Sequence, residues 1–156
     1  MHIMVAAVGQ RMPRWVVDAW TEYTRRMPAN LGLSLREIPL AKRGKNADTR
    51  RLKSAESEAL YSAMPPRANI IALDVKGQSW STEKLAENLQ NWMADGRDVG
   101  LMIGGPDGIS NDIMQKADTR WSLGPLTLPH PLVRVVLAEQ LYRAWTITQN
   151  HPYHRA

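Results

Sequence analysis

The sequence predicts a single α/β domain with a mostly parallel sheet and helices on both of its faces. Short apolar runs of strand-like composition alternate along the chain with amphipathic segments of helical spacing, the order typical of parallel βαβ units. The 156 residues suit one domain, and their apolar fraction of 44% and charged fraction of 22% are ordinary for a globular protein. Because no repeat or linker divides the chain, we expect residues 1–156 to form one domain.

Two strands and two helices are expected in the first half of the chain. The apolar run at residues 2–8 predicts a strand that stops at Gly9. Apolar side chains recur at helical spacing in the next segment, and again before Pro65 and Pro66, which end a helix. The predicted elements are strands at residues 2–8 and 33–38 and helices at residues 13–27 and 46–64.

Six further elements are expected in the second half. Ser81 is a plausible N-cap, although Lys84 leaves its capping box incomplete, and Pro131 suits the first turn of a helix. The predicted elements are strands at residues 69–75, 99–103 and 120–123 and helices at residues 82–94, 111–117 and 131–149.

The last predicted helix carries apolar residues on more than one face. A helix that covers one face of a sheet needs only a single apolar stripe. Leu132, Val135 and Val136 add to the stripe that contains Leu137 and Leu141. We therefore expect a homodimer that buries the second face. The alternative is that the C-terminal tail folds over it.

The positive charge is concentrated in one segment. The net charge is +5, and residues 36–53 alone carry it, with seven basic residues against Glu37 and Asp48. Such a cluster favours a polyanion partner such as RNA, although a solvated loop and helix face would look the same. Lys42, Arg43 and Lys45 are the main candidates for phosphate contacts.

Several classes of protein are disfavoured by composition. The chain has no cysteine, which excludes disulfides and thiolate metal sites. It has no apolar run long enough for a membrane span, and its N-terminus resembles a strand rather than a signal peptide. His151 and His154 are separated by Pro152 without a nearby carboxylate, so no metal site is expected. We expect a cytoplasmic protein without a membrane partner.

Two segments in the second half break from an apolar run into glycine and proline. Residues 101–109 read LMIGGPDGI, and residues 123–134 read LGPLTLPHPLVR. Loops of this kind form ligand crevices at the ends of parallel strands. Neither is a P-loop or a dinucleotide fingerprint. The first could be an ordinary turn, and the second a stiff loop that begins a helix. Alternatively, the glycines of the first segment let a ligand approach the main chain, and peptide groups of Leu126, Thr127 and Leu128 could hydrogen-bond the edge of an adenine.

Longer motifs identify a resemblance to a known family. IGGPDG, LTLPHPLVRVVLAEQLYRAW and the terminal NHPYHR occur in this order, together with KRGKNAD at residues 42–48 and LDVKG at residues 73–77. The chain closely resembles the RlmH (YbeA-type) family of the SPOUT methyltransferase superfamily over its whole length.

The resemblance implies a fold, a cofactor and a reaction. The fold is α/β with a C-terminal trefoil knot, and the homodimer binds S-adenosylmethionine in the knot. The implied reaction is N3-methylation of a pseudouridine in the 23S rRNA stem-loop at the subunit interface of the assembled ribosome. The residues implied to bind the cofactor are Leu73, Gly104, Gly105, Leu123, Gly124, Pro125, Leu126, Thr127 and Leu128. Because Pro125 has no N–H, it can contribute only its carbonyl or van der Waals contacts.

The same resemblance gives the C-terminal tail a catalytic role. His154 is the first candidate for handling the N3 proton, Tyr153 could stack on the base, and Arg155 could hold a phosphate or the uracil oxygens. The tail would order over the cofactor of the partner subunit. Without the resemblance, a frayed terminus would be the simpler interpretation. The alternative functions are a non-enzymatic ribosome-binding protein of the same fold and a phosphate-ester hydrolase that uses the glycine-rich loop.

Overall fold

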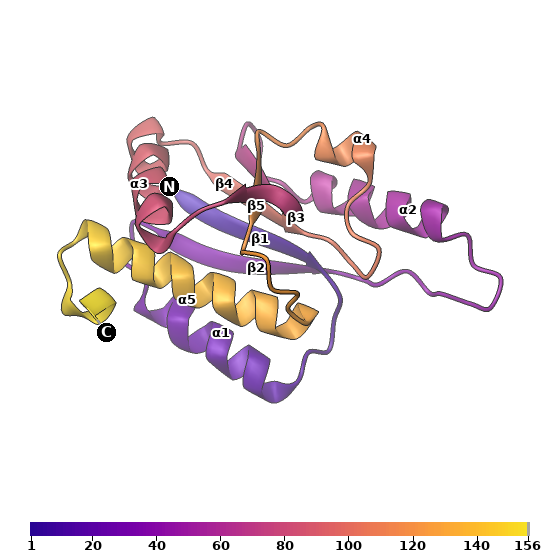
Figure 1. Cartoon of the computed structure of the whole chain (residues 1–156), viewed down its shortest axis with the longest axis horizontal. Helices are drawn as coiled ribbons and strands as arrows, with labels where there is room; N and C mark the ends of the chain where they lie inside the picture. Colours follow the sequence, from indigo (N-terminus) through magenta and orange to yellow (C-terminus); the bar gives the residue numbers. More distant parts are fainter. Residues whose placement is uncertain (156) are drawn as a thin grey trace.

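The computed structural model describes residues 1–155, which form a five-stranded parallel sheet covered by helices on both faces (Figure 1). The order across the sheet is β2-β1-β4-β3-β5, and every neighbouring pair is parallel. The strands are β1 (His2–Val8), β2 (Gly32–Ile38), β3 (Asn69–Ser79), β4 (Val99–Ile103) and β5 (Thr119–Ser122). The helices are α1 (Arg14–Arg26), α2 (Thr49–Ser62), α3 (Thr82–Asp95), α4 (Asn111–Met114) and α5 (His130–Thr148), followed by the 3₁₀ turn η1 (Pro152–Arg155).

Two apolar cores hold the layers together, one on each face of the sheet. Side chains of α1, α3 and α5 pack on one face, where Trp20, Leu89 and Leu141 meet the strands. Side chains of α2 and α4, among them Leu60 and Ile113, pack on the other face. The central strand β4 is buried along its whole length because its side chains alternate between the two cores. The predicted α/β architecture with helices on both faces is therefore confirmed.

Local hydrogen bonds explain where the observed helices begin and end. The helix expected from residue 46 starts at Thr49, because the Asp48 side chain caps it by accepting from the N–H of Arg51 at 3.3 Å. The predicted N-cap at Ser81 is confirmed, since its side chain accepts from the N–H of Lys84 at 3.0 Å. The helix expected over residues 111–117 ends at Met114, because the Asp118 N–H already donates to the Ile70 carbonyl of β3 at 2.8 Å.

Strand β3 is longer than expected and bulges where it pairs with its neighbour β5. Leu73 and Gln78 both pair with Trp121, so the residues between them bulge out of the ladder. The backbone crosses closely here, since a Cβ on Gly77 would lie 2.7 Å from the carbonyl carbon of Arg120. Chain segments far apart in sequence are thus held against each other beside β5. The trefoil knot implied by the resemblance stays a prediction.

The last helix connects the two ends of the molecule. Its 19 residues span about 28 Å at the usual rise per residue. It lies beside α1 and α3 on the sheet, with the C-terminal turn η1 packed at its far end (Figure 1). Its outer residues Leu132, Val135 and Val136 are half-buried and belong to neither apolar core. Within residues 1–155, no helix is long and apolar enough to cross a membrane.

Candidate cofactor-binding site

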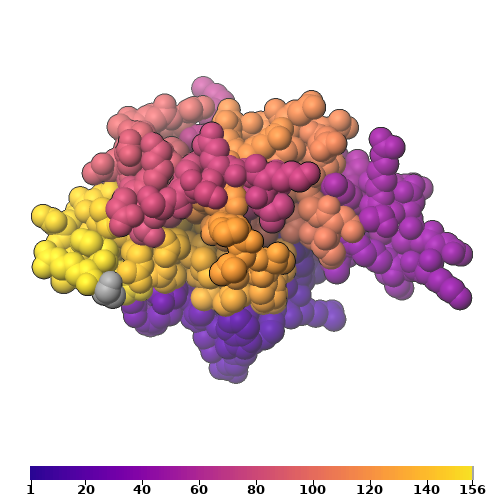
Figure 2. Space-filling view, viewed as in Figure 1, coloured from indigo at the N-terminus to yellow at the C-terminus, as the bar shows by residue number. Residues whose placement is uncertain are grey.

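A cleft of about 970 Å³ opens at the carboxyl ends of β3, β4 and β5. Its walls are the loop after β4, the bulge of β3 and the loop between β5 and α5. Figure 2 shows this last loop, in orange, on the surface below the end of β3. The carboxyl edge of a parallel sheet is the usual place for a ligand crevice, because loops diverge there and leave peptide groups exposed. The two segments that the sequence singled out therefore meet as walls of one cleft.

The first wall is the loop Gly104–Gly108, which folds back on itself. The Gly108 N–H donates to the Gly105 carbonyl at 3.0 Å, and Gly108 adopts a φ of +82° that favours glycine. A side chain on Gly104 would collide with the Gly108 backbone, since its Cβ would lie 2.7 Å from the carbonyl carbon. Glycine is therefore required at residue 104 for the turn itself. The turn interpretation and the ligand interpretation of this segment are compatible.

The second wall is the irregular segment of residues 123–129. In the part of the chain that the structure describes, the N–H groups of Leu126, Thr127 and Leu128 make no hydrogen bond within the protein. Pro125 and Pro129 restrict this segment and keep it out of the sheet. A rigid segment with uncommitted peptide groups beside an apolar cleft can bind the edge of a planar ring. Leu126 adds an exposed side chain at the mouth, 78% accessible to solvent.

The predicted cofactor residues gather at this cleft with one exception. Eight of the nine line it, as the following set shows: Leu73, Gly104, Gly105, Leu123, Gly124, Leu126, Thr127 and Leu128. Pro125 is exposed and does not contribute to the lining. A contact through its carbonyl stays a prediction.

Two buried polar atoms support a polar ligand in the cleft. Trp121 Nε1 and His130 Nε2 belong to cleft-lining residues, are shielded from solvent and have no hydrogen-bond partner among the described residues. Leaving a buried polar atom unpaired costs about 1–3 kcal/mol, so such atoms in a cleft are suited to meeting a ligand. With its volume, its leucines and its uncommitted peptide groups, the cleft fits a nucleoside-containing cofactor such as S-adenosylmethionine.

An ion pair between the buried Arg134 and the more exposed Glu37 lies beside the cleft. Arg134 on α5 is 1% exposed, contacts Glu37 Oε2 at 2.6 Å and donates to the Gly9 carbonyl at 2.9 Å. Burial, and secondly the positive charge of Arg134, lowers the pKa of His130 below its usual range. His130 is therefore neutral at physiological pH. His130 is the first residue of α5 and lines the cleft, where it can contact a ligand.

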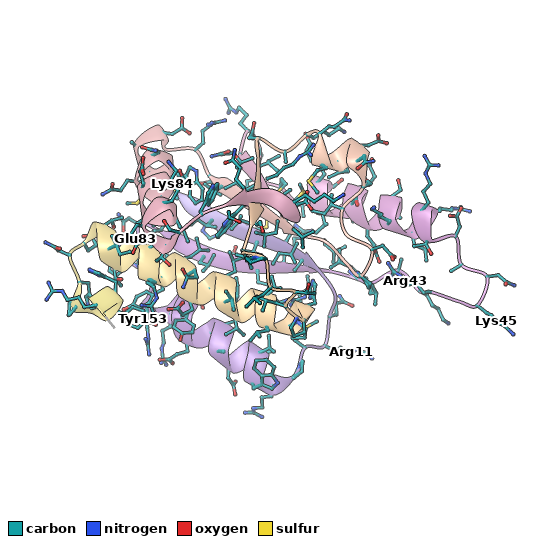
Figure 3. All side chains as sticks on the ribbon, in the orientation of Figure 1. Arg11, Arg43, Lys45, Glu83, Lys84 and Tyr153 are labelled. Atoms are coloured by element: carbon teal, nitrogen blue, oxygen red, sulfur yellow. The ribbon has the colours of Figure 1, made fainter. Side chains whose placement is uncertain are left out.

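The predicted catalytic tail lies at the opposite end of α5. Tyr153 packs its ring on Tyr142 with centroids 4.7 Å apart, and its hydroxyl donates to Glu139 Oε1 at 3.3 Å. Arg143 lies over the Tyr153 ring at 5.0 Å and forms an i,i+4 ion pair with Glu139 at 2.7 Å. Burial is the main reason that the pKa of Tyr153 rises to about 12. None of Tyr153, His154 and Arg155 lines the cleft of its own chain. Figure 3 shows Tyr153 near the C-terminal end of α5.

The three basic residues of the predicted RNA-binding segment point in different directions. Lys42 and Lys45 are exposed, and Figure 3 shows Lys45 at the tip of the loop that carries it. Arg43 instead turns inward, where its guanidinium contacts Glu56 at 2.9 Å and Asp107 at 2.8 Å. Lys42 and Lys45 are thus placed for a polyanion, whereas the Arg43 side chain is committed to the protein.

Sequence reasoning overlooked the buried polar residues of α2. Glu56 is 2% exposed and accepts from Arg43 and from the Ala41 N–H, while the buried Ser57 hydroxyl accepts from the Ser110 N–H at 2.8 Å. Polar residues on the inner face of an amphipathic helix are the available signal, but their partners are distant in sequence. Among residues 1–155, no group of three or more His, Asp or Glu side chains forms a potential metal site.

Comparison with known proteins agrees with this geometry. A family model described as predicted SPOUT methyltransferase matches residues 1–154. Proteins named ribosomal RNA large subunit methyltransferase H match 99% of this chain over their full length. They include those of Ectopseudomonas mendocina at 54% identity, Stutzerimonas stutzeri at 52% and Pseudomonas putida strain F1 at 53%. Matches of this length and identity show that the chain belongs to the SPOUT methyltransferase family.

Proposed function

We propose that this protein methylates 23S rRNA of the large ribosomal subunit with S-adenosylmethionine as methyl donor. The acceptor is N3 of a pseudouridine in the stem-loop at the subunit interface, and the substrate is the assembled ribosome in the cytoplasm. The observation that carries the proposal is the convergence of both glycine- and proline-rich loops on one cleft at the carboxyl edge of the sheet. The full-length relatives named as rRNA large subunit methyltransferases support methyl transfer to rRNA of the large subunit.

The cleft residues bind and orient the cofactor. The peptide groups of Leu126, Thr127 and Leu128 would hold the adenine, and the side chains of Leu73 and Leu123 would add apolar contacts. His130 Nε2 and Trp121 Nε1 offer further hydrogen-bonding atoms for the polar remainder. When bound, S-adenosylmethionine supplies an electrophilic methyl group, so the protein needs no covalent nucleophile. Catalysis then depends on holding the acceptor nitrogen in line with that methyl group.

His154, the predicted candidate for the N3 proton, does not line the cleft of its own chain, and a second copy supplies it. The tail is separated from the cleft by the length of α5, about 28 Å. The half-buried Leu132, Val135 and Val136 lie near the cleft end of α5, and Trp15 on the adjacent α1 is 54% exposed. A homodimer that buries this apolar face in antiparallel fashion brings the tail of one copy to the cleft of the other. His154 then accepts the proton while Tyr153 and Arg155 position the base.

Two measurements test the proposal. Calorimetry with S-adenosylmethionine is expected to show one site per chain, and mass spectrometry of rRNA from a deletion strain is expected to lack one methyl group on a pseudouridine. The purified protein should restore that methyl group on ribosomes from the deletion strain. Unchanged rRNA in the deletion strain would favour the alternative of a non-enzymatic ribosome-binding protein. Absence of cofactor binding, both free and with ribosomes, would refute methyl transfer.

A further inference from the structure

Arg43 joins three parts of the chain that are separate in sequence. Its guanidinium donates to both Glu56 carboxylate oxygens at 2.9 and 3.0 Å, to Asp107 Oδ2 at 2.8 Å, and to the Ala41 carbonyl at 2.9 Å. Glu56 lies on α2, Asp107 lies in the glycine-rich wall of the cleft, and Ala41 lies in the basic loop of residues 39–48. Bidentate pairing of this kind fixes geometry as well as charge.

The clamp acts on the loop that forms the first wall of the cleft. Glu56 Oε1 would lie 2.9 Å from a Cβ on Gly105, so this carboxylate packs directly under the loop as well as pairing with Arg43. One residue further along α2, the Ser57 hydroxyl accepts from the Ser110 N–H at 2.8 Å. Residues of α2 thus contact the glycine-rich loop at both of its ends. Arg43 connects α2 to the same loop by pairing with both Glu56 and Asp107.

The same residue also reaches the surface expected to contact RNA. Lys42 and Lys45, on either side of the Arg43–Gly44 pair, are exposed, and Leu40 at the base of the basic loop lines the cleft. The Ala41 N–H donates to Glu56 Oε2 at 2.9 Å, so the backbone of the basic loop is tied to the same carboxylate. A phosphate held by the two lysines therefore restricts a loop that shares its anchor with the cofactor wall.

We infer that Arg43 is a positioning residue that fixes the Gly104–Gly108 wall and couples RNA contact at the basic loop to cofactor binding in the cleft. This inference rests on the proposed function, and it assigns Arg43 a role different from the direct phosphate contact predicted for it. The RNA and the cofactor would both bind to segments that Arg43 holds in place. Binding of one therefore raises the affinity for the other by the same factor. Typical coupling of this kind is about 5- to 150-fold.

Two conservative variants test the clamp. Asp107→Asn keeps the Arg43–Glu56 pair and weakens only the link to the cleft wall, whereas Arg43→Lys keeps the charge and removes the bidentate geometry. Arg43→Ala is avoided, because it would leave the buried Glu56 carboxylate unpaired and endanger folding. The matched control is Lys84→Ala, on the exposed face of α3 with Glu87 as its surface partner.

The first readout needs no ligand. Hydrogen exchange of the Gly108 amide, which bonds to the Gly105 carbonyl, is expected to accelerate about tenfold or more in Asp107→Asn and Arg43→Lys. Amides of α1 and α3 should exchange as in the parent protein. Unchanged exchange at residue 108 in both variants would overturn the clamp, whatever the protein methylates.

The second readout measures coupling with the unreactive product S-adenosylhomocysteine and ribosomes from a deletion strain. The parent protein and Lys84→Ala should bind S-adenosylhomocysteine at least fivefold more tightly when ribosomes are present. Both clamp variants should retain less than twofold coupling. Parent-like coupling in the variants would overturn the inference while leaving the proposed function intact. A parent protein that binds neither ligand would refute the proposed function, and the exchange experiment would still decide on the clamp.

Discussion

The cleft and the C-terminal tail were expected to form one active site, yet they differ in how a single chain arranges them. The cleft is assembled within one chain, because parallel strands bring the ends of β3, β4 and β5 to the same edge. The tail packs on Tyr142 and Glu139 at the distant end of α5. One helix of about 28 Å separates them. A single copy thus holds the cleft and the tail apart.

The separation of the tail from the cleft points to a role for the outer face of α5. Its inner side chains, such as Leu137 and Leu141, fill the core, while Leu132, Val135 and Val136 remain half-buried outside it. If two copies meet across this face, each tail completes the other cleft. Dimerisation would then be a condition of catalysis as well as of stability.

Charges placed on the outer face of α5 should prevent dimerisation. The tail of one copy would then no longer reach the cleft of the other. The double variant Val135→Glu, Val136→Glu is expected to be monomeric by light scattering, because two carboxylates would be buried at the interface. Methylation should fall about 1000-fold or more, while circular dichroism stays that of a folded α/β protein. Gln90→Glu, Asn91→Glu adds the same charges to exposed residues of α3 and should change neither property. A fully active monomer would disprove the need for a second copy.

Removal of the tail should affect chemistry and spare the cofactor. Deletion of residues 153–156 is expected to lower the methylation rate about 100-fold or more, the scale of a lost general base. Affinity for S-adenosylmethionine, measured by calorimetry, should change less than about threefold, since none of Tyr153, His154 and Arg155 lines the cleft of its own chain. Tyr153→Phe is the milder comparison, because it keeps the ring on Tyr142 and removes only the hydroxyl bond to Glu139. Retained activity in the deletion would make the tail structural.

Loss of the two exposed lysines should weaken RNA binding without changing the free cleft. For Lys42→Ala, Lys45→Ala, the slope of log affinity for ribosomes against log salt is expected to fall by roughly 1.4 to 1.8, the share of two phosphate contacts. Affinity for S-adenosylmethionine alone should stay within about twofold. Lys84→Ala serves again as the control for a lost exposed charge. An unchanged salt slope would remove the basic loop from the interface.

The smallest effect concerns pH. Because the native pKa of His130 is lowered, the unfolded chain binds a proton near pH 6.5 while the native chain does not. The contribution of His130 therefore stabilises the native state above the pKa of the unfolded chain. It is lost as the pH falls from that pKa through the lower pKa of the native state. His130→Gln should flatten the fall of Tm between pH 7 and pH 5, by less than about 3 °C. A steeper fall in the variant would contradict a neutral, buried imidazole.

Local sequence patterns predicted most of the fold and both walls of the cleft. Glycine and proline at residues 104–108 and 123–131 mark the ends of strands, and the edge of a parallel sheet gathers such ends. The roles of Arg43 and Glu56 could not be read in the same way. A basic run predicts a solvated surface, and only tertiary structure turns one of its members toward a buried carboxylate. The separation of tail and cleft depends likewise on the direction of α5, which periodicity does not give.

Complementation between two inactive chains tests the shared site most directly. Gly104→Val, which forces a side chain against the Gly108 backbone, damages the cleft, and deletion of residues 153–156 removes the tail. A tagged heterodimer of these two chains holds one intact cleft facing one intact tail and should recover about half of the parent activity. A heterodimer of the parent chain with a chain carrying both changes should be inactive. The opposite pattern, with the first pair inactive and the second active, would show that tail and cleft act within one chain.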